Sequence, residues 1–127
     1  MAVREGLLYS KDHEWILVEG NKAKVGVTDY AQAQLGDIVF VELPQEGDSV
    51  AKGDGIIVIE SVKAAADAYS PVSGSIAEVN EDLMDAPETI NEDPYEGGWL
   101  VVIELDDESE LEELLSPEEY QGFIEEE

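Results

Sequence analysis

Lys63 is the residue whose setting in this sequence points most directly to chemistry. It lies three residues after Glu60, and three alanines, Ala64–Ala66, follow it. It also lies ten residues after Gly53 and eleven before Gly74. Both glycines mark turns, so one strand should lead up to the lysine and another should lead away. The spacing predicts that Lys63 sits near the tip of a hairpin, where small neighbours leave its amine open to a modifying enzyme.

The predicted hairpin is part of a series of short strands. Alternating or β-branched apolar runs predict strands at residues 14–19, 22–27, 37–43, 55–60, 64–69, 74–79 and 99–105. The run Gly55–Glu60 is apolar without alternation, which is typical of a strand buried on both faces. We interpret Gly47, Gly53 and Gly74 as turn glycines.

Helices are expected at two places. Thr28 suits the N-cap of a short helix over residues 29–35 that Gly36 ends. Leucines at helical spacing, and then a Ser-Pro-Glu-Glu helix start at residue 116, predict a helical extension over about residues 107–127. Residues 80–98 are interpreted as loops with a helical turn near 82–86. We therefore expect one mostly β domain over residues 1–127, with a short internal helix and a C-terminal helix.

The composition excludes several classes of function. The chain has no cysteine and one histidine, which rules out disulfides, cysteine nucleophiles and histidine-rich metal sites. Its 32 acidic residues against six basic ones give a formal net charge of -26, so nucleic acid and anionic membranes should be repelled. No apolar run reaches the length of a membrane span. We expect a soluble cytoplasmic protein of a prokaryote, and the charge suggests a high-salt cytoplasm in which self-repulsion is screened.

The spacing of glycines and acidic residues around Lys63 resembles that of the biotinyl/lipoyl carrier-domain superfamily. Within it, the pentapeptide Glu60-Ser61-Val62-Lys63-Ala64 is similar to the lipoylation site of glycine cleavage H proteins. Further stretches that resemble this family are residues 13–15, 27–32, 35–44, 70–74, 91–95 and 98–100. The resemblance therefore covers nearly the whole chain.

This resemblance implies a fold, a cofactor and partners. The fold would be a small lipoyl-type barrel-sandwich of short antiparallel strands. Lipoate would be joined to Lys63 by an amide bond, with Glu60, Ser61, Val62 and Ala64 as the flank recognised by a lipoate ligase or a lipoyl/octanoyl transferase. The chain would be a non-catalytic carrier without a metal. It would take the aminomethyl group of glycine from glycine decarboxylase (P protein) to aminomethyltransferase (T protein), and dihydrolipoyl dehydrogenase (L protein) would reoxidise the arm.

A carboxylate pocket should protect the loaded arm, because the cargo carries an amine that is protonated near neutral pH. We nominate Glu14, then Asp67, then Asp12, which stands where many relatives have serine. The alternative for Glu14 is that it is one more solvated carboxylate among 32 acidic residues. His13 is interpreted as structural.

Other functions remain open at the sequence level. The same lysine would serve a lipoate relay that supplies 2-oxo acid dehydrogenase subunits, or an H-like carrier in sulfur oxidation. A non-modified binding module with the same fold is a further alternative, which the retained Lys63 and its flanks argue against.

Overall fold

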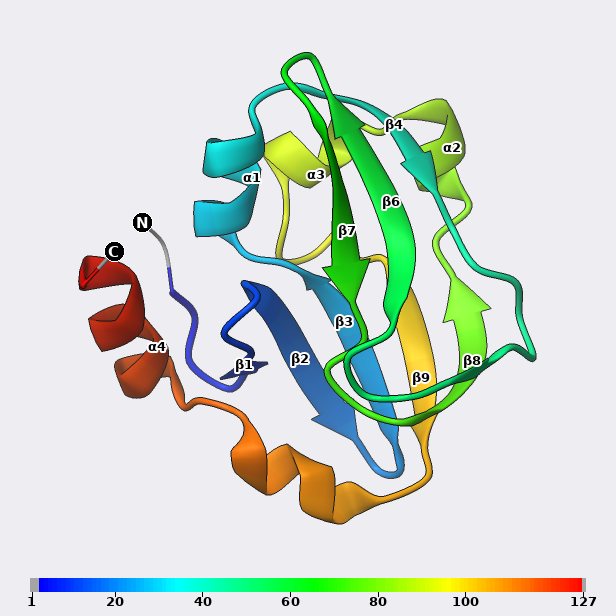
Figure 1. Ribbon diagram of the computed structural model, residues 1–127, viewed down its shortest axis with the longest axis vertical. Coiled ribbons are helices and arrows are strands. Elements are labelled where there is room, and N and C mark those ends of the chain that lie inside the picture. Colours follow the sequence, from blue (N-terminus) through cyan, green and yellow to red (C-terminus); the bar gives the residue numbers. More distant parts are fainter. Residues whose placement is uncertain (1–2, 127) are drawn as a thin grey trace.

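Two antiparallel sheets make up most of the computed structural model, which describes residues 3–126 (Figure 1). The larger sheet has the strand order β1-β2-β3-β9-β8-β5. Its strands are β1 (Leu8–Tyr9), β2 (Glu14–Glu19), β3 (Lys22–Val27), β9 (Val101–Leu105), β8 (Gly74–Val79) and β5 (Ser49–Val50). The smaller sheet has the order β4-β6-β7, with β4 (Ile38–Glu42), β6 (Gly55–Ser61) and β7 (Ala65–Tyr69). Strand β7 is therefore an edge strand.

The core lies between the inner faces of the two sheets. Alternate residues of β3, such as Ala23 and Val25, face inward because side chains of a strand alternate between its faces. They share one buried cluster with Ile57 and Ile59 of β6 and Ile103 of β9. Burial of these aliphatic side chains is the main force that holds the sheets together.

The prediction that β6 is buried on both faces is wrong. Ile57 and Ile59 are buried, whereas Ile56 and Val58, which alternate with them, are only half-buried. No described element covers the outer face of the smaller sheet in Figure 1. The β-branched residues of β6 are thus explained by two causes. Those on the inner face are buried, and those on the partly solvated outer face favour the strand conformation.

Within residues 3–126, five short helices pack around the sheets. They are α1 (Asp29–Leu35), α2 (Asp82–Asp85), α3 (Thr89–Glu92), the 3₁₀ helix η1 (Glu108–Glu113) and α4 (Pro117–Glu125). The predicted start of α1 is confirmed, since the Thr28 hydroxyl accepts a hydrogen bond from Ala31 N at 3.2 Å. The predicted capping box of α4 is also present, with Ser116 and Glu119 bonding to each other's backbone N–H groups.

The C-terminal leucines do not form one continuous helix. The chain is extended at Leu114, and Leu115 makes a β-bridge with Tyr9, whose backbone hydrogen bonds measure 2.7 and 2.9 Å. This bridge stops η1 and turns the chain toward α4. Helix α4 then packs Tyr120 and Ile124 into a second buried cluster with Tyr9 and Trp15.

Gly74 is not a turn glycine as predicted. It begins strand β8 and pairs with both Val50 and Leu105. A Cβ at this position would overlap the backbone carbonyl oxygen of Glu104. Glycine is needed at this position because strand β9 lies too close for a side chain.

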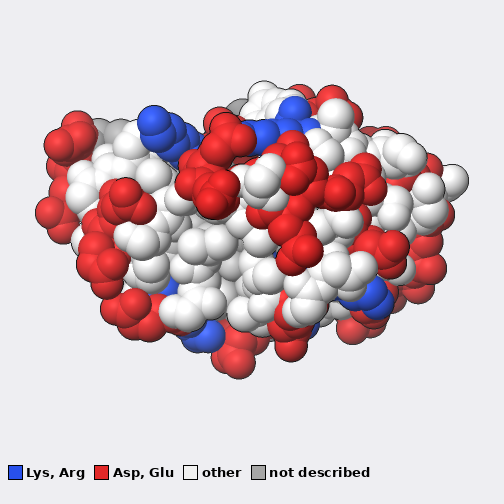
Figure 2. All heavy atoms as spheres, turned by 90° about the horizontal axis from the view of Figure 1, so that it is seen from below, with Lys and Arg blue, Asp and Glu red and all other residues white. Residues whose placement is uncertain are grey.

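The surface carries the acidic excess. Figure 2 shows carboxylates spread over the face seen from below, with Lys and Arg at only a few places. Within residues 3–126, no helix is long and apolar enough to cross a membrane.

Candidate functional site

Lys63 is exposed in the turn that joins β6 to β7, at the tip predicted from its spacing (Figure 1). The turn is closed by a hydrogen bond from Ser61 N to Ala64 O at 2.8 Å. The Ser61 hydroxyl also accepts from Lys63 N at 3.1 Å and from Ala64 N at 3.2 Å. A serine side chain thus fixes the backbone of the lysine, whose side chain is exposed.

The hairpin tip rests on the segment between α1 and β4. Val62 N donates to Asp37 O at 2.9 Å. Gly36 has φ +82°, and a Cβ there would lie 2.9 Å from the Cε atom of Lys63. The positive φ favours glycine here, whereas the exposed lysine stem could move away from a Cβ. The stem therefore lies against the end of α1.

Helix α3, which was not predicted from the sequence, holds the segment between α1 and β4 in place. Its Asn91 amide donates to Gly36 O at 2.9 Å and accepts from Ile38 N at 2.9 Å. The sequence offered a signal, because Asn91 falls in a stretch that resembles the H-protein family, but the stretch was interpreted as a loop.

A cavity of about 180 Å³ opens between edge strand β7, helix α1 and residues 12–14. The three carboxylates nominated from the sequence, Asp12, Glu14 and Asp67, all line it. Helix α1 supplies one wall through Tyr30, Ala31, Gln34 and Leu35. This wall was not predicted from the sequence, although positions four apart on a helix share a face.

Glu14 is buried, with 2% of its surface exposed, so the solvated alternative is wrong. Its Oε1 accepts from the Ser10 hydroxyl at 2.6 Å, and its Oε2 accepts from Tyr69 N at 3.1 Å. Burial outweighs these hydrogen bonds and raises the pKa of Glu14 to about 7. This carboxyl group can therefore exchange a proton near neutral pH.

Asp67 and Asp12 are exposed at the same cavity. The cavity thus combines one buried, protonatable carboxyl with two solvated carboxylates. Such an arrangement can attract a cationic group and hold it against an apolar wall.

The predicted recognition flank surrounds the lysine. Glu60 is exposed and lies opposite Ala65 on β7 and Phe40 on β4. Val62 is 67% exposed and Ala64 is exposed. These side chains are accessible to an enzyme that approaches the tip, and their role in recognition stays a prediction.

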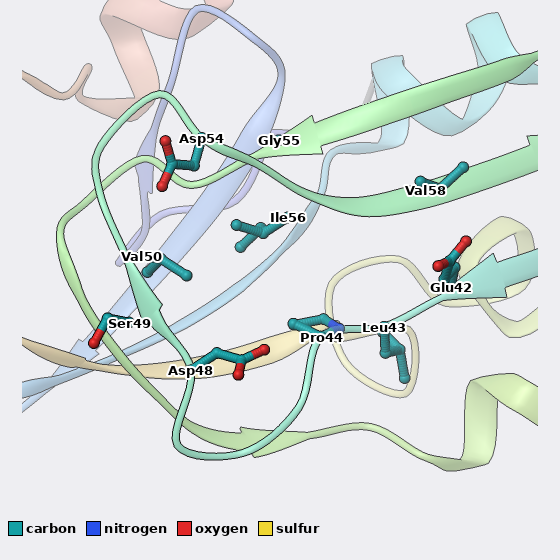
Figure 3. Close-up of a pocket in the computed structure, with 10 residues that line it drawn as sticks. All are labelled: Glu42, Leu43, Pro44, Asp48, Ser49, Val50, Asp54, Gly55, Ile56 and Val58. Carbon is teal, nitrogen blue, oxygen red and sulfur yellow. The ribbon is translucent and has the colours of Figure 1, made fainter.

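A larger hollow lies elsewhere. It has a volume of about 580 Å³ and opens beside the end of β4, strand β5 and the start of β6. Figure 3 shows the carboxylates of Glu42, Asp48 and Asp54 around apolar side chains such as Val50 and Ile56. Lys63 follows the opposite end of β6, and a strand of seven residues spans roughly 20 Å. This hollow is therefore separate from the lysine.

The two sheets and their short helices form a lipoyl-type barrel-sandwich, and an exposed lysine lies at the tip of one hairpin. Residues 7–127 match the family described as glycine cleavage H-protein, and the chain belongs to that family.

Relatives and a solved structure agree with this assignment. A glycine cleavage system H protein of Alkaliphilus oremlandii is 61% identical, over 96% of this chain and 95% of the relative. That of Carboxydothermus hydrogenoformans is 54% identical, over 98% of this chain and 96% of the relative. The crystal structure of a glycine cleavage system H protein from Mycobacterium marinum superimposes with a TM-score of 0.87 at 37% identity, covering 97% of this chain and 99% of that one.

Proposed function

We propose that this protein carries lipoate on Lys63 and takes the aminomethyl group of glycine from P protein to T protein, with L protein reoxidising the arm. The observation that carries the proposal is the exposed lysine of the hairpin, whose stem lies against Gly36 beside the cavity that Glu14 lines. The chain itself is non-catalytic, because it holds and presents a group on which other enzymes act.

The residues present fit the proposed cofactor. Lys63 offers a solvated amine for an amide bond, and the flank of Glu60, Ser61, Val62 and Ala64 is open to a lipoate ligase or a lipoyl/octanoyl transferase. Ala31 and Leu35 give the cavity an apolar wall for a hydrocarbon chain. When bound, the dithiolane would supply the reversible sulfur chemistry that accepts and releases the one-carbon unit.

Glu14 would hold the cargo by changing its protonation state when the cargo binds. Near neutral pH its raised pKa leaves the buried carboxyl group partly protonated. An ammonium group placed beside it favours the ionised form, so Glu14 gives up its proton and forms a charge-assisted hydrogen bond. Asp67 and Asp12 would attract the ammonium at the rim of the cavity. The site would therefore hold a cation and exclude water from it.

Two measurements test the function. Wild-type protein and the Lys63→Arg variant are each treated with lipoate and a lipoate ligase, and their intact masses are determined. We expect one lipoyl amide on wild-type protein, located on the Lys63 peptide, and none on the variant, which keeps the positive charge. Lipoylated protein should then support exchange of bicarbonate into glycine by P protein.

Failure at either step would be informative. A wild-type chain that the ligase leaves unmodified has no swinging arm, and the carrier proposal falls. A lipoylated chain that does not support the exchange is a carrier for a different pathway. Conditions that mimic a prokaryotic, high-salt cytoplasm are appropriate for both measurements.

A further inference from the structure

The hydroxyl group of Tyr120 joins both sides of the arm cavity. It lies 2.9 Å from Nδ1 of His13 and 2.7 Å from Oγ1 of Thr28. Tyr120 belongs to the C-terminal helix α4, is fully buried and does not itself line the cavity. One buried atom on a distant element therefore links the 12–14 segment to the start of α1.

Each of the two linked residues sets a wall of the cavity. His13 lines the cavity directly, between Asp12 and Glu14. Thr28 is the N-cap of α1, whose residues 30, 31, 34 and 35 form the opposite wall. The backbone of the same two residues is also paired, with Thr28 N donating to His13 O at 3.1 Å.

His13 holds an unusual backbone conformation. Within residues 3–126 it is the only non-glycine residue with positive φ, at 68°. Such a conformation is uncommon for a residue with a side chain and persists when surrounding contacts fix it. Those contacts include a stack of the imidazole on Tyr30 with ring centroids 4.6 Å apart, in addition to the bond to Tyr120. The segment that bears Glu14 is therefore held from the side of α4.

We propose that Tyr120 is a positioning residue for the arm: its hydroxyl group ties the His13 ring to the Thr28 cap and so fixes the two walls between which the loaded arm lies. This inference rests on the proposed function, since it concerns the cavity that would hold the cargo. It assigns the C-terminal helix a role in protecting the cargo without any contact with it.

Tyr9 provides a matched control within the same ring stack. Its ring lies parallel to that of Tyr120, with centroids 4.5 Å apart and an interplanar angle of 6°. The Tyr9 hydroxyl, however, bonds to the backbone N and O of Arg4, both at 2.8 Å. Tyr9→Phe and Tyr120→Phe thus each remove one hydroxyl from the same aromatic pair, and only the second breaks the link to the cavity.

The test compares cargo lifetimes in lipoylated full-length protein. Wild type, Tyr9→Phe and Tyr120→Phe are loaded with glycine and P protein, P protein is removed, and the spontaneous loss of the aminomethyl group is followed. We expect loss from Tyr120→Phe to be about five times faster than from wild type, a factor on the scale of one hydrogen bond, because the hydroxyl that positions His13 and Thr28 is removed. Loss from Tyr9→Phe should match wild type within a factor of about two.

A spectroscopic signature separates positioning from general loosening. The chain has a single histidine, so its ring nitrogen resonances belong to His13 alone. Tyr120→Phe should shift the Nδ1 resonance, and Tyr9→Phe should leave it unchanged. If Tyr120→Phe does not fold, His13→Asn replaces it, because asparagine tolerates the left-handed backbone yet cannot reach both aromatic partners. That variant should show the same faster loss.

The failure of this inference is distinguishable from that of the function. Equal cargo lifetimes in Tyr120→Phe and Tyr9→Phe, with wild type loading normally, would overturn the role of Tyr120 and leave the carrier intact. Failure of wild type itself to load would overturn the carrier function and this inference with it.

Discussion

Glu14 connects the two sheets at a free strand edge. The amide N–H of Tyr69 points away from β6, and the Glu14 carboxyl group accepts its hydrogen bond. This contact gives the part-buried edge amide a hydrogen-bond partner that no neighbouring strand supplies. Under the proposed function the same carboxyl group would also hold a cation, and for that role a titratable acid with a pKa of about 7 suits this position better than an amide.

The Glu14→Gln variant should change how stability depends on pH. Burial raises the pKa of Glu14 from 4.5 to about 7, so the folded state binds this proton more tightly than the unfolded chain does. The stability gained from it is complete below about pH 4.5 and declines as pH rises to about 7. Denaturant unfolding from pH 4.5 to 8 should therefore show wild type losing on the order of 2–3 kcal/mol relative to Glu14→Gln. Glu19→Gln, at the exposed end of the same strand, controls for the lost charge. Parallel pH profiles for wild type and Glu14→Gln would contradict the raised pKa.

The same pair of variants tests the role of Glu14 in holding cargo. In lipoylated protein at pH 7.5, Glu14→Gln should lose the aminomethyl group several times faster than wild type, because an amide cannot supply the negative charge that holds an ammonium. Glu19→Gln should match wild type. An unchanged lifetime in Glu14→Gln would remove this residue from the arm pocket.

At the scale of elements, one hydroxyl group stabilises the turn at the tip of the β6–β7 hairpin. Ser61 Oγ accepts from two consecutive backbone N–H groups, those of Lys63 and Ala64. It also donates to Ala64 O at 3.2 Å. These bonds fix the backbone of the tip, and none of them involves the lysine side chain.

Ser61→Ala should therefore slow modification of Lys63 more than it weakens the fold. We expect kcat/KM for lipoate attachment to fall about three-fold, because the turn samples conformations that the attaching enzyme does not bind. The free energy of unfolding should change by less than about 1 kcal/mol, since these bonds are exposed to solvent. Ser49→Ala, at an exposed serine of β5, serves as the control for both measurements. A full rate of attachment in Ser61→Ala would show that the enzyme shapes the turn itself.

The sequence predicted the elements whose signals lie in neighbouring residues of the chain. The N-cap Thr28 and the capping box of Ser116 and Glu119 are written in neighbouring residues, and both are confirmed. Strands β1 and β5 have two residues each and exist only because a longer strand lies beside them, so no local pattern could reveal them.

The same distinction holds for the candidate site, where some features follow from the local sequence and others depend on residues far away in the chain. The position of Lys63 at a hairpin tip follows from spacing along the chain. The burial of Glu14 does not, because it depends on the Tyr69 amide 55 residues away. The link through Tyr120 joins residues 107 and 92 positions apart, and from the sequence this tyrosine is placed only within the C-terminal helical extension.

For the whole molecule, the unusual quantity is charge. Thirty-two acidic and six basic residues leave a formal net charge of -26 on 127 residues. Described ion pairs join Arg4 to Glu96 at 3.5 Å and Lys52 to Glu113 at 2.7 Å, and both lie at the surface, where such pairs contribute little. The remaining carboxylates repel one another in the folded state at low ionic strength.

Screening of this repulsion should make stability rise with salt. The Debye length is about 10 Å at 0.1 M and falls to about 3 Å at 1 M, which is shorter than the spacing of most surface charges. At pH 7.5 we expect the melting temperature to increase by roughly 5–10 °C between 0.05 and 1 M KCl, equivalent to about 1–2 kcal/mol. The isoelectric point of about 4.1 supplies the control, because net repulsion disappears near that pH and the gain from KCl should disappear with it. A melting temperature that stays flat or falls with KCl at pH 7.5 would contradict adaptation to a high-salt cytoplasm. An equal gain at both pH values would instead assign the effect to stronger burial of apolar surface in salt, since that contribution does not depend on the charge of the carboxylates.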